Sequence, residues 1–359
     1  MTFIHIPKMG LKLISLGQLI MAFVVLTLSL SPTPSESCNI FEGSWVYDIS
    51  YPPFYDASIQ CPFIDSGLNC LKNARPDKMY LHYRWQPTSC NISRFDGKKF
   101  LERHRGKKVM FVGDSLSNSQ WQSLGCMLHA AVPNANYTFT SRARISTIFF
   151  PEYGVSVMYM KDGFLVSLVN GTLMLDTLSG SESWKGIDVL VFNSYHWWLH
   201  TGRFKTWNAY QVGNQTIKDI DVMEAYKIAL TTWANWADSN IDPTKTRVFF
   251  QGISAVHYHG ADWNEPGVQD CRGQTKPVEG SNYPGTKPPG DEVMRSVLGK
   301  MKRPAILLDI VLLTQLRKDG HTSIYSGGEM DCSHWCLPGV PDTWNQLMYT
   351  ILMQNSSFP

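Results

Sequence analysis

The chain has 359 residues, of which 43% are hydrophobic and 12% aromatic, and this apolar mass is enough for one large core or a core with a small satellite domain. A chain of this composition folds, so intrinsic disorder is excluded. The formal net charge of +2 is too small for the basic field that nucleic-acid binding needs, and we expect no nucleic-acid partner.

The N-terminus has the layout of a targeting signal. A segment over 1–12, with Lys8 and Lys12, precedes an apolar run over 13–30 and a short stem over 31–37. Positive residues hold the N-terminal end in the cytosol, which places the rest of the chain in the lumen. The apolar run is long for a signal peptide and short for a membrane span, so both remain open. Because no A-x-A cleavage site precedes Cys38, we favour a single uncleaved anchor.

Cysteines and glycosylation motifs agree with entry into the secretory pathway. An even number of cysteines in an oxidising compartment indicates disulfides, here four, whose pairing the sequence does not give. The eight cysteines are Cys38, Cys61, Cys70, Cys90, Cys126, Cys271, Cys332 and Cys336. The Asn-x-Ser/Thr motifs predict N-glycosylation at Asn91, Asn136, Asn170, Asn214 and Asn355.

Residues 38–95 are dense in cysteine, aromatic residues and proline and show no sustained helical period. We expect a disulfide-stapled, loop-rich segment. Either a cap packed on the main core or a separate binding module fits this length.

The remainder, 96–359, alternates short apolar runs with stretches of helical spacing. We expect buried parallel strands over 109–112, 188–192, 247–251 and 305–313, and helices over 118–129 and 222–237. This alternation predicts an open α/β sheet with helices on both faces. The Pro/Gly-rich stretch 265–290 predicts a long surface loop.

The first of these strands runs into Gly113-Asp114-Ser115, at an expected strand-to-helix turn. A serine there stands at the carboxyl edge of the sheet, where ligands bind in open α/β folds, with helix N–H groups behind its hydroxyl. Ser115 is therefore a candidate nucleophile. The alternative is that Asp114 or Ser115 only caps the helix.

A nucleophilic serine needs a histidine held by a carboxylate. Asp331 and His334 are three residues apart and can meet on one face of a turn, which Cys332 and Cys336 would pin by disulfides. The predicted triad is Ser115, His334 and Asp331.

Other histidines and cysteines offer rival sites. Asp319 and His321 form the chief competing acid–base pair. His257 and His259 suit an exposed loop better than a metal site. Cys332, His334 and Cys336 do not have the usual spacing of zinc ligands, and thiols oxidise in this compartment, so we expect no metal.

The predicted strand over 188–192 is followed by Asn193 and then by His196, Trp197 and Trp198. Asn193 and the Ser115 N–H are candidate oxyanion donors. The tryptophans are either core or a surface on which sugar rings stack, together with Trp207, Trp233, Trp236 and Trp263. His196, Trp197, Trp198 and Arg203 are the candidate substrate-binding residues.

These motifs, in this order, resemble the plant trichome-birefringence-like family, in which a cysteine-rich N-terminal segment precedes a PC-esterase domain. The resemblance covers nearly everything after Cys38. It is carried by Cys38, Phe41, Gly43, Trp45 and Val46, by Cys61-Pro62-Phe63, by Arg75-Pro76-Asp77, by Tyr83-Arg84-Trp85 and Pro87, by Gly113-Asp114-Ser115, by Asn193 with His196-Trp197-Trp198, and by Asp331 with His334-Trp335-Cys336-Leu337-Pro338-Gly339.

The resemblance implies an SGNH-like α/β/α domain that transfers acetyl groups onto cell-wall polysaccharide at the Golgi membrane, with Ser115 as nucleophile, His334 as base and Asp331 as its acid. It implies an acetyl donor as co-substrate and no bound cofactor. The stretches 142–146 and 201–213, with Arg203, look most like the pectin-linked branch, which favours homogalacturonan over xylan or other hemicellulose as acceptor. Two positions depart from the family pattern: Ala74 stands where glycine is usual, and Ser194-Tyr195 replace Thr-Gly after Asn193.

Two other functions remain open. Water in place of a sugar acceptor would make the same triad a secreted acetylesterase. A non-catalytic pectin-binding or bridging protein of the wall would use the aromatic residues, with Ser115 as a helix cap.

Overall fold

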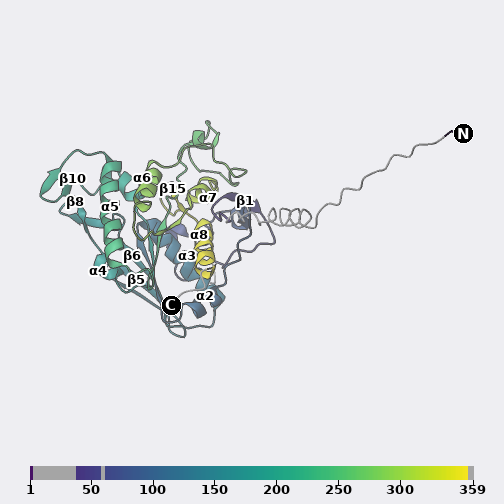
Figure 1. Cartoon of the computed structure of the whole chain (residues 1–359), viewed down its shortest axis with the longest axis horizontal. Helices are drawn as coiled ribbons and strands as arrows, with labels where there is room; N and C mark the ends of the chain where they lie inside the picture. Colours follow the sequence, from purple (N-terminus) through teal and green to yellow (C-terminus); the bar gives the residue numbers. More distant parts are fainter. Residues whose placement is uncertain (3–37, 58–60, 355–359) are drawn as a thin grey trace. The chain divides into compact units, whose positions relative to one another are not determined.

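The apolar runs of the second part of the chain build a seven-stranded sheet in the order β13-β12-β9-β3-β6-β5-β4 (Figure 1). The computed structural model describes residues 1–2, 38–57 and 61–354. Strands β13, β12, β9, β3 and β6 are parallel, whereas β5 and β4 form an antiparallel edge. Their bounds are Lys108–Gly113 (β3), Thr138–Arg142 (β4), Ile145–Phe150 (β5), Val155–Lys161 (β6), Val189–Phe192 (β9), Arg247–Gln251 (β12) and Ile306–Leu308 (β13).

Helices cover both faces of this sheet, as predicted (Figure 1). On one face lie α2 (Gly97–Arg103), α3 (Ser115–Ala131) and α8 (Val340–Gln354), and on the other lie α5 (Val222–Asn240) and α6 (Pro289–Leu298). The short helices are α4 (Ser181–Trp184) and α7 (Val311–Gln315).

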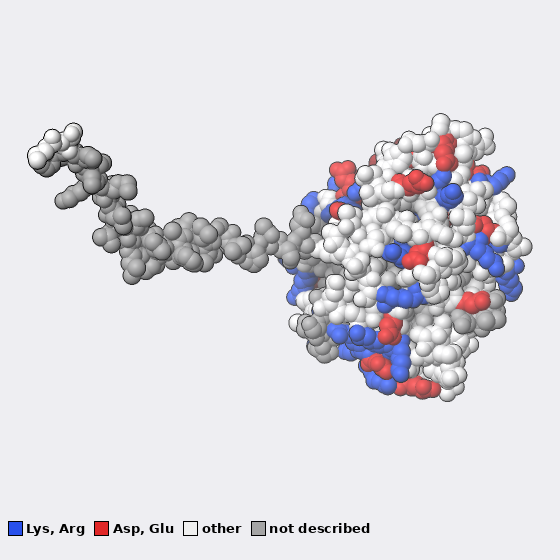
Figure 2. Space-filling view, turned by 90° about the vertical axis from the view of Figure 1, so that its right-hand side faces the viewer, with Lys and Arg blue, Asp and Glu red and all other residues white. Residues whose placement is uncertain are grey.

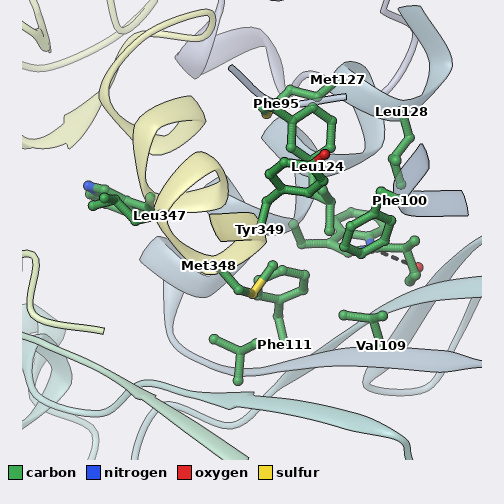
Figure 3. Packing of buried hydrophobic residues seen from close by; sticks show 14 of the residues in the cluster. Phe95, Phe100, Val109, Phe111, Leu124, Met127, Leu128, Leu347, Met348 and Tyr349 are labelled. Atoms are coloured by element: carbon green, nitrogen blue, oxygen red, sulfur yellow. Dashed lines mark hydrogen bonds between the residues drawn. The ribbon is translucent and has the colours of Figure 1, made fainter. Parts of the chain in front are cut away.

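Side chains of β3 show how one strand serves two cores. Val109 and Phe111 point to the α3 and α8 face, whereas Met110 and Val112 point to the α5 and α6 face. Figure 3 shows Val109 and Phe111 beneath residues of α3 and α8 such as Leu124 and Met348. A strand buried on both faces reads as a continuous apolar run, which is why it was recognisable in the sequence. The α/β class with a mostly parallel sheet is confirmed.

The predicted strand over 305–313 is wrong in its second half. The strand ends at Leu308, and the apolar residues from Val311 onward form α7. Both pieces are buried, and a short buried apolar run does not distinguish a strand from a helix by its pattern.

A second, four-stranded sheet in the order β11-β10-β8-β7 was not predicted. Its strands are β7 (Val166–Val169), β8 (Thr172–Leu178), β10 (Ala209–Val212) and β11 (Gln215–Ile217). Most side chains of β7 and β11 are exposed or half-buried, so these strands lack the apolar run that marks a core strand.

The cysteine-rich segment is a cap on the main core rather than a separate module. Strand β1 (Gly43–Tyr47) pairs with β2 (Tyr83–Pro87), and 3-10 turns at Ser66–Leu68 and Met79–His82 lie between them. Trp45 donates an indole hydrogen bond of 2.8 Å to the Leu313 carbonyl, and the core of the α3 face includes Tyr55, Phe63 and Trp85.

All eight cysteines are disulfide-bonded, as predicted. Cys61–Cys126 and Cys70–Cys336 tie the cap to the main domain, and Cys271–Cys332 ties the long loop to strand β15 (Asp331–Trp335). Strand β15 pairs with β14 (His321–Ser323).

The surface carries basic and acidic side chains interspersed on the face shown in Figure 2. Asn91, Asn136, Asn170 and Asn214 are exposed, and Asn355 lies outside the described residues. The run 13–30 proposed as anchor or signal also lies outside them. Among the helices that the structure describes, none is long and apolar enough to cross a membrane.

Candidate active site

Ser115 is the first residue of α3, directly after β3 at the carboxyl edge of the parallel sheet. Asp114 is the N-cap, and its Oδ1 accepts a hydrogen bond of 2.9 Å from the Leu116 N–H. The capping role is therefore real, but Asp114 holds it, which leaves the Ser115 hydroxyl free. Only glycine fits at position 113, because a Cβ there would overlap the Asn193 carbonyl and the Ser117 hydroxyl.

His334 and Asp331 come from β15 and meet Ser115 from the other end of the chain. His334 Nε2 lies 2.6 Å from Ser115 Oγ, and His334 Nδ1 lies 2.7 Å from Asp331 Oδ2. The other carboxylate oxygen, Oδ1, accepts from the Ser333 N–H at 2.9 Å, the Ser333 hydroxyl at 2.8 Å and the His334 N–H at 3.1 Å. With Asp331 as acceptor at Nδ1, the neutral imidazole presents the Nε2 lone pair to the serine hydroxyl.

Two disulfides hold this turn on both sides. Cys332 is bonded to Cys271 of the long loop, and Cys336 is bonded to Cys70 of the cap. His321 Nδ1 also lies 2.9 Å from the His334 carbonyl oxygen. The main chain on either side of His334 is thus fixed by covalent and hydrogen bonds, which keeps its imidazole within reach of Ser115.

The charge of Asp331 suits His334 to act as a general base. Burial alone would lower the pKa of His334, but its hydrogen bond to Asp331 and the negative charge there outweigh burial and raise that pKa. Burial would raise the pKa of Asp331, yet the hydrogen bonds from His334 and Ser333 hold it well below its usual range. Asp331 therefore stays ionised and stabilises an imidazolium at His334.

Asn193 follows β9 and is buried beside the nucleophile. Its Nδ2 donates a hydrogen bond of 2.6 Å to Oδ1 of Asp114. Asp114 thus fixes both the helix N-terminus behind Ser115 and the amide of Asn193. The sequence offered Asp114 only as a cap, and its contact with Asn193 became visible only once β3 and β9 were seen to be neighbours.

His196 lies on the other side of Asp114. Its Nδ1 is 3.8 Å from Asp114 Oδ2, and its Nε2 is 3.1 Å from the Ser254 carbonyl oxygen. Burial lowers the pKa of His196, although the Asp114 charge opposes this. With 16% of its side chain exposed, His196 borders the site without reaching Ser115 by any hydrogen bond among the described residues.

The other predicted substrate residues divide into different environments. Trp197 is half-buried, with the Lys161 ammonium 5.6 Å from its ring centroid. Arg203 is exposed and pairs with Glu329 at 2.7 Å. Trp198 is 1% exposed and donates its indole N–H to Ser194, so the prediction that it contacts substrate is wrong.

For the other tryptophans the structure supports the core alternative rather than an aromatic groove. Trp207, Trp233 and Trp263 are at most 4% exposed, and Trp236 packs against the α5 and α6 core. Tryptophan has a large apolar ring that fills core positions, so its density in a sequence does not predict a surface.

The rival pairs have structural roles. Asp319 accepts two hydrogen bonds from the buried guanidinium of Arg317 at 2.8 and 3.0 Å. His321 stacks on Trp335 and lies 2.7 Å from His257, so it does not pair with Asp319. His257 is fully buried, contrary to the expectation of an exposed loop, and only His259 is exposed.

Cys332 and Cys336, which we considered as metal ligands and set aside, are in disulfides and have no thiolate to offer. No group of three or more His, Cys, Asp or Glu that would suit a metal ion occurs within the described part of the chain.

Comparison with known families agrees with this arrangement. Residues 36–91 match the PMR5 N-terminal domain, and residues 92–351 match the GDSL/SGNH-like acyl-esterase family found in Pmr5 and Cas1p. The chain is 56% identical over 329 residues to trichome birefringence-like protein 42 of Arabidopsis thaliana, which covers 89% of this chain and 90% of that protein.

The chain belongs to the trichome birefringence-like family. It is also 52% identical to protein 38 of that family, over 89% of this chain and 84% of the relative, and 51% identical to protein 43, over 91% of each, both from Arabidopsis thaliana. An SGNH-like acyl-esterase domain implies acyl-transfer or esterase chemistry.

Both departures from the trichome birefringence-like pattern have structural consequences. Ala74 has φ +63°, a left-handed conformation that explains why glycine is usual there. Tyr195 is 3% exposed, and its ring packs so closely on Gly290 at the start of α6 that no side chain would fit at position 290. Tyr195 therefore forms part of a wall beside His196 rather than blocking Ser115.

Proposed function

We propose that this protein is an O-acetyltransferase that acylates a plant cell-wall polysaccharide through an acetyl-serine at Ser115. The observation that carries the proposal is the continuous chain from Ser115 Oγ to His334 Nε2 at 2.6 Å and from His334 Nδ1 to Asp331 Oδ2 at 2.7 Å. A non-catalytic binding protein has no need of this arrangement.

In the first step, His334 takes the proton of the Ser115 hydroxyl, and Oγ attacks the acetyl carbonyl of the donor. The oxyanion of the tetrahedral intermediate accepts hydrogen bonds from the Ser115 N–H and from the amide of Asn193, which Asp114 holds in place. The intermediate collapses, the bond to the donor's leaving group breaks, and His334 returns the proton to that group.

In the second step, a sugar hydroxyl attacks the acetyl-serine while His334 accepts its proton. Collapse of the second tetrahedral intermediate breaks the bond to Ser115 Oγ, which regains the proton from His334. Asp331 stabilises the imidazolium in both steps because its depressed pKa keeps it ionised.

An acetylesterase is the second candidate, and the exposure of the site favours it. The side chains of His334 and Asp331 are 29% and 24% exposed, so water reaches the base when no acceptor chain covers it. Hydrolysis of the acetyl-serine would then compete with transfer.

Likeness to the pectin-linked branch supports homogalacturonan as first acceptor, with xylan or another hemicellulose second. A Golgi membrane location, with a single N-terminal anchor and a lumenal catalytic domain, is supported by Lys8 and Lys12 before the apolar run. The disulfides and exposed glycosylation motifs support an oxidising compartment, and secretion to the wall is the alternative.

The test is to incubate the detergent-purified full chain with an acetyl donor and de-acetylated homogalacturonan or xylan oligomers, and to follow product mass beside Ser115→Ala. Gain of one acetyl group that vanishes in the variant supports the transferase. Serine-dependent loss of acetyl from pre-acetylated oligomers, without gain, supports the esterase. Binding of oligomers with neither change supports the non-catalytic protein.

A further inference from the structure

Two neighbouring hollows on the surface run from His196 to the cysteine-rich cap. The first, of about 240 Å³, is lined by His196, Val256 and Asp262 among others. The second, of about 430 Å³, is lined by Phe41, Glu42 and Thr88 of the cap and by Asp309. Tyr283, Lys287 and Gln315 line both, so the hollows form one groove, whose size suits a ligand site.

One end of this groove approaches the site through His196, although Ser115, His334 and Asp331 are not among the residues that line either hollow. His196 belongs to its wall, and His196 Nδ1 is 3.8 Å from Asp114, the residue that precedes Ser115. The other end lies on the cap, so a ligand that fills the groove is an extended molecule rather than a single small ring.

The walls offer apolar and aromatic surface to such a ligand. Leu199 and Val256, which line the first hollow, are 45% and 41% exposed, so both offer apolar surface to a ligand. Tyr283 is half-buried at the junction of the two hollows. Sugar rings present C–H faces that pack on surfaces of this kind.

The charges along the groove are mainly negative. The charged side chains of its walls are Glu42, Asp262, Asp309 and Lys287. Asp309 is neutralised by Arg295 at 2.6 Å, and Lys287 lies 3.9 Å from Asp291. Glu42 and Asp262 are exposed, and no cation of the described residues lies within ion-pair distance of either. A chain with a carboxylate on every ring would be repelled here.

We infer that this groove binds an uncharged stretch of the acceptor glycan, which for homogalacturonan means its methyl-esterified form rather than the free acid. The inference rests on the proposed function and adds the charge state of the substrate to it. It also gives the cysteine-rich cap a part in holding the acceptor chain.

Trp197, the residue after His196, has a positive charge near its ring. Lys161 lies over Trp197 and, within the described chain, has no carboxylate in ion-pair range. Lys161 is the register partner of Gly113 at the carboxyl edge of the sheet, so it also borders the site. An acidic chain would take this side instead, which makes Lys161 the matched control.

The experiment measures binding by calorimetry to the detergent-purified full chain with Ser115→Ala, so that turnover does not matter. The ligands are oligogalacturonates of one length, fully methyl-esterified or de-esterified, and a xylo-oligomer as a second neutral chain. At low salt we expect the esterified oligomer to bind about 10-fold more tightly than the free acid, with the difference shrinking as salt screens the wall charges.

Four variants locate the effect. Glu42→Gln with Asp262→Asn is expected to strengthen binding of the free acid about 5-fold and leave the esterified oligomer unchanged, a modest effect because both charges are exposed. Tyr283→Ala is expected to weaken binding of both neutral ligands about 10-fold, since it removes the ring on which a sugar face packs. Tyr283→Phe is expected to bind both neutral ligands as tightly as the chain with Tyr283. Lys161→Gln is expected to leave the binding of both neutral ligands unchanged.

Tighter binding of the free acid, weakened by Lys161→Gln, would overturn the inference and place the chain on the Trp197 side. Equal binding of both forms, or neutral binding that Tyr283→Ala leaves unchanged, would also overturn it. These results are separable from the proposed function, because acetyl transfer by the wild-type chain is measured independently of where and in what charge state the glycan binds.

Discussion

The amide of Asn193 donates a 2.6 Å hydrogen bond to Asp114, the residue that caps the helix of the nucleophile. Two parallel neighbouring strands, β3 and β9, bring these residues together from positions far apart in the sequence. The cap and the candidate oxyanion donor are therefore one unit behind Ser115.

If Asn193 stabilises the oxyanion, Asn193→Ala should lower kcat about 100-fold with little change in KM, because the contact forms only in the transition state. Asn118→Ala is the control, since Asn118 lies three residues after Ser115 on the same helix and donates to Asp65 instead. Equal loss in both variants would assign Asn193 a purely structural role.

The pH dependence of activity should follow His334. The base must be neutral, and its pKa is raised, so kcat/KM should rise with pH with a midpoint above about 6.5. Asp331→Asn removes the cause of the increase, so the midpoint should move to lower pH while the rate falls about 10⁴-fold. A midpoint unmoved by Asp331→Asn would contradict the assignment.

The same pair should affect folding stability. The raised pKa of His334 stabilises the fold at pH below about 6.5, and this is lost as pH rises through the folded-state pKa. The depressed pKa of Asp331 stabilises the fold above about pH 4, and this contribution is lost as pH falls through the folded-state pKa of Asp331. The pair therefore stabilises most between these limits, and Asp331→Asn should flatten this part of a stability–pH curve.

Two disulfides of similar sequence span allow an effect on folding stability to be distinguished from an effect on catalysis. Cys271–Cys332 and Cys61–Cys126 span 61 and 65 residues, so chain entropy predicts similar losses, of about 2–5 kcal/mol, when each pair is replaced by serine. Only the first adjoins His334. We expect Cys271→Ser with Cys332→Ser to lower kcat at least 10-fold at a temperature where both variants are folded, and the other pair to leave kcat near wild type. Equal kcat values would show that this disulfide does not position the base.

The left-handed backbone conformation of Ala74 predicts that Ala74→Gly stabilises the fold measurably. It is exposed and has φ +63°, so Ala74→Gly removes left-handed strain without losing buried surface. After the entropy cost of glycine, we expect a gain of about 0.5–1 kcal/mol in thermal unfolding. Ala143→Gly, at φ +52° and also exposed, should behave alike. Ala261 lies in the 3-10 turn Gly260–Trp263 and does not have a positive φ, so Ala261→Gly should be destabilising. A loss at position 74 would mean that the turn is not strained.

The sequence was sufficient to predict a strand that is buried on both faces, such as β3. The run before Ser115 and the helix after it follow from apolar pattern and capping chemistry, and the turn with Asp331 and His334 follows from residue type and spacing. The bond between Asn193 and Asp114 depends on strand order, which residue pattern does not encode.

Burial was the other quantity that local pattern could not supply. His257 was expected in an exposed loop, and Trp198 was left open between core and surface. Both are buried, because each finds a hydrogen-bond partner inside, Ser194 for the indole and Gln315 for the imidazole. The second sheet escaped prediction because strands such as β11 are mostly exposed. Disulfide pairing needed the fold, since eight cysteines allow about a hundred connectivities.

The most direct test of the account is to trap the acyl-enzyme. The full chain is incubated with a small activated acetyl ester, quenched in acid and digested, and the peptide that contains Ser115 is weighed by mass spectrometry. We predict one added acetyl group on Ser115, greatly reduced in His334→Ala. Turnover of the ester that persists in Ser115→Ala, with no acetyl group on this peptide in the wild type, would contradict the central role of Ser115.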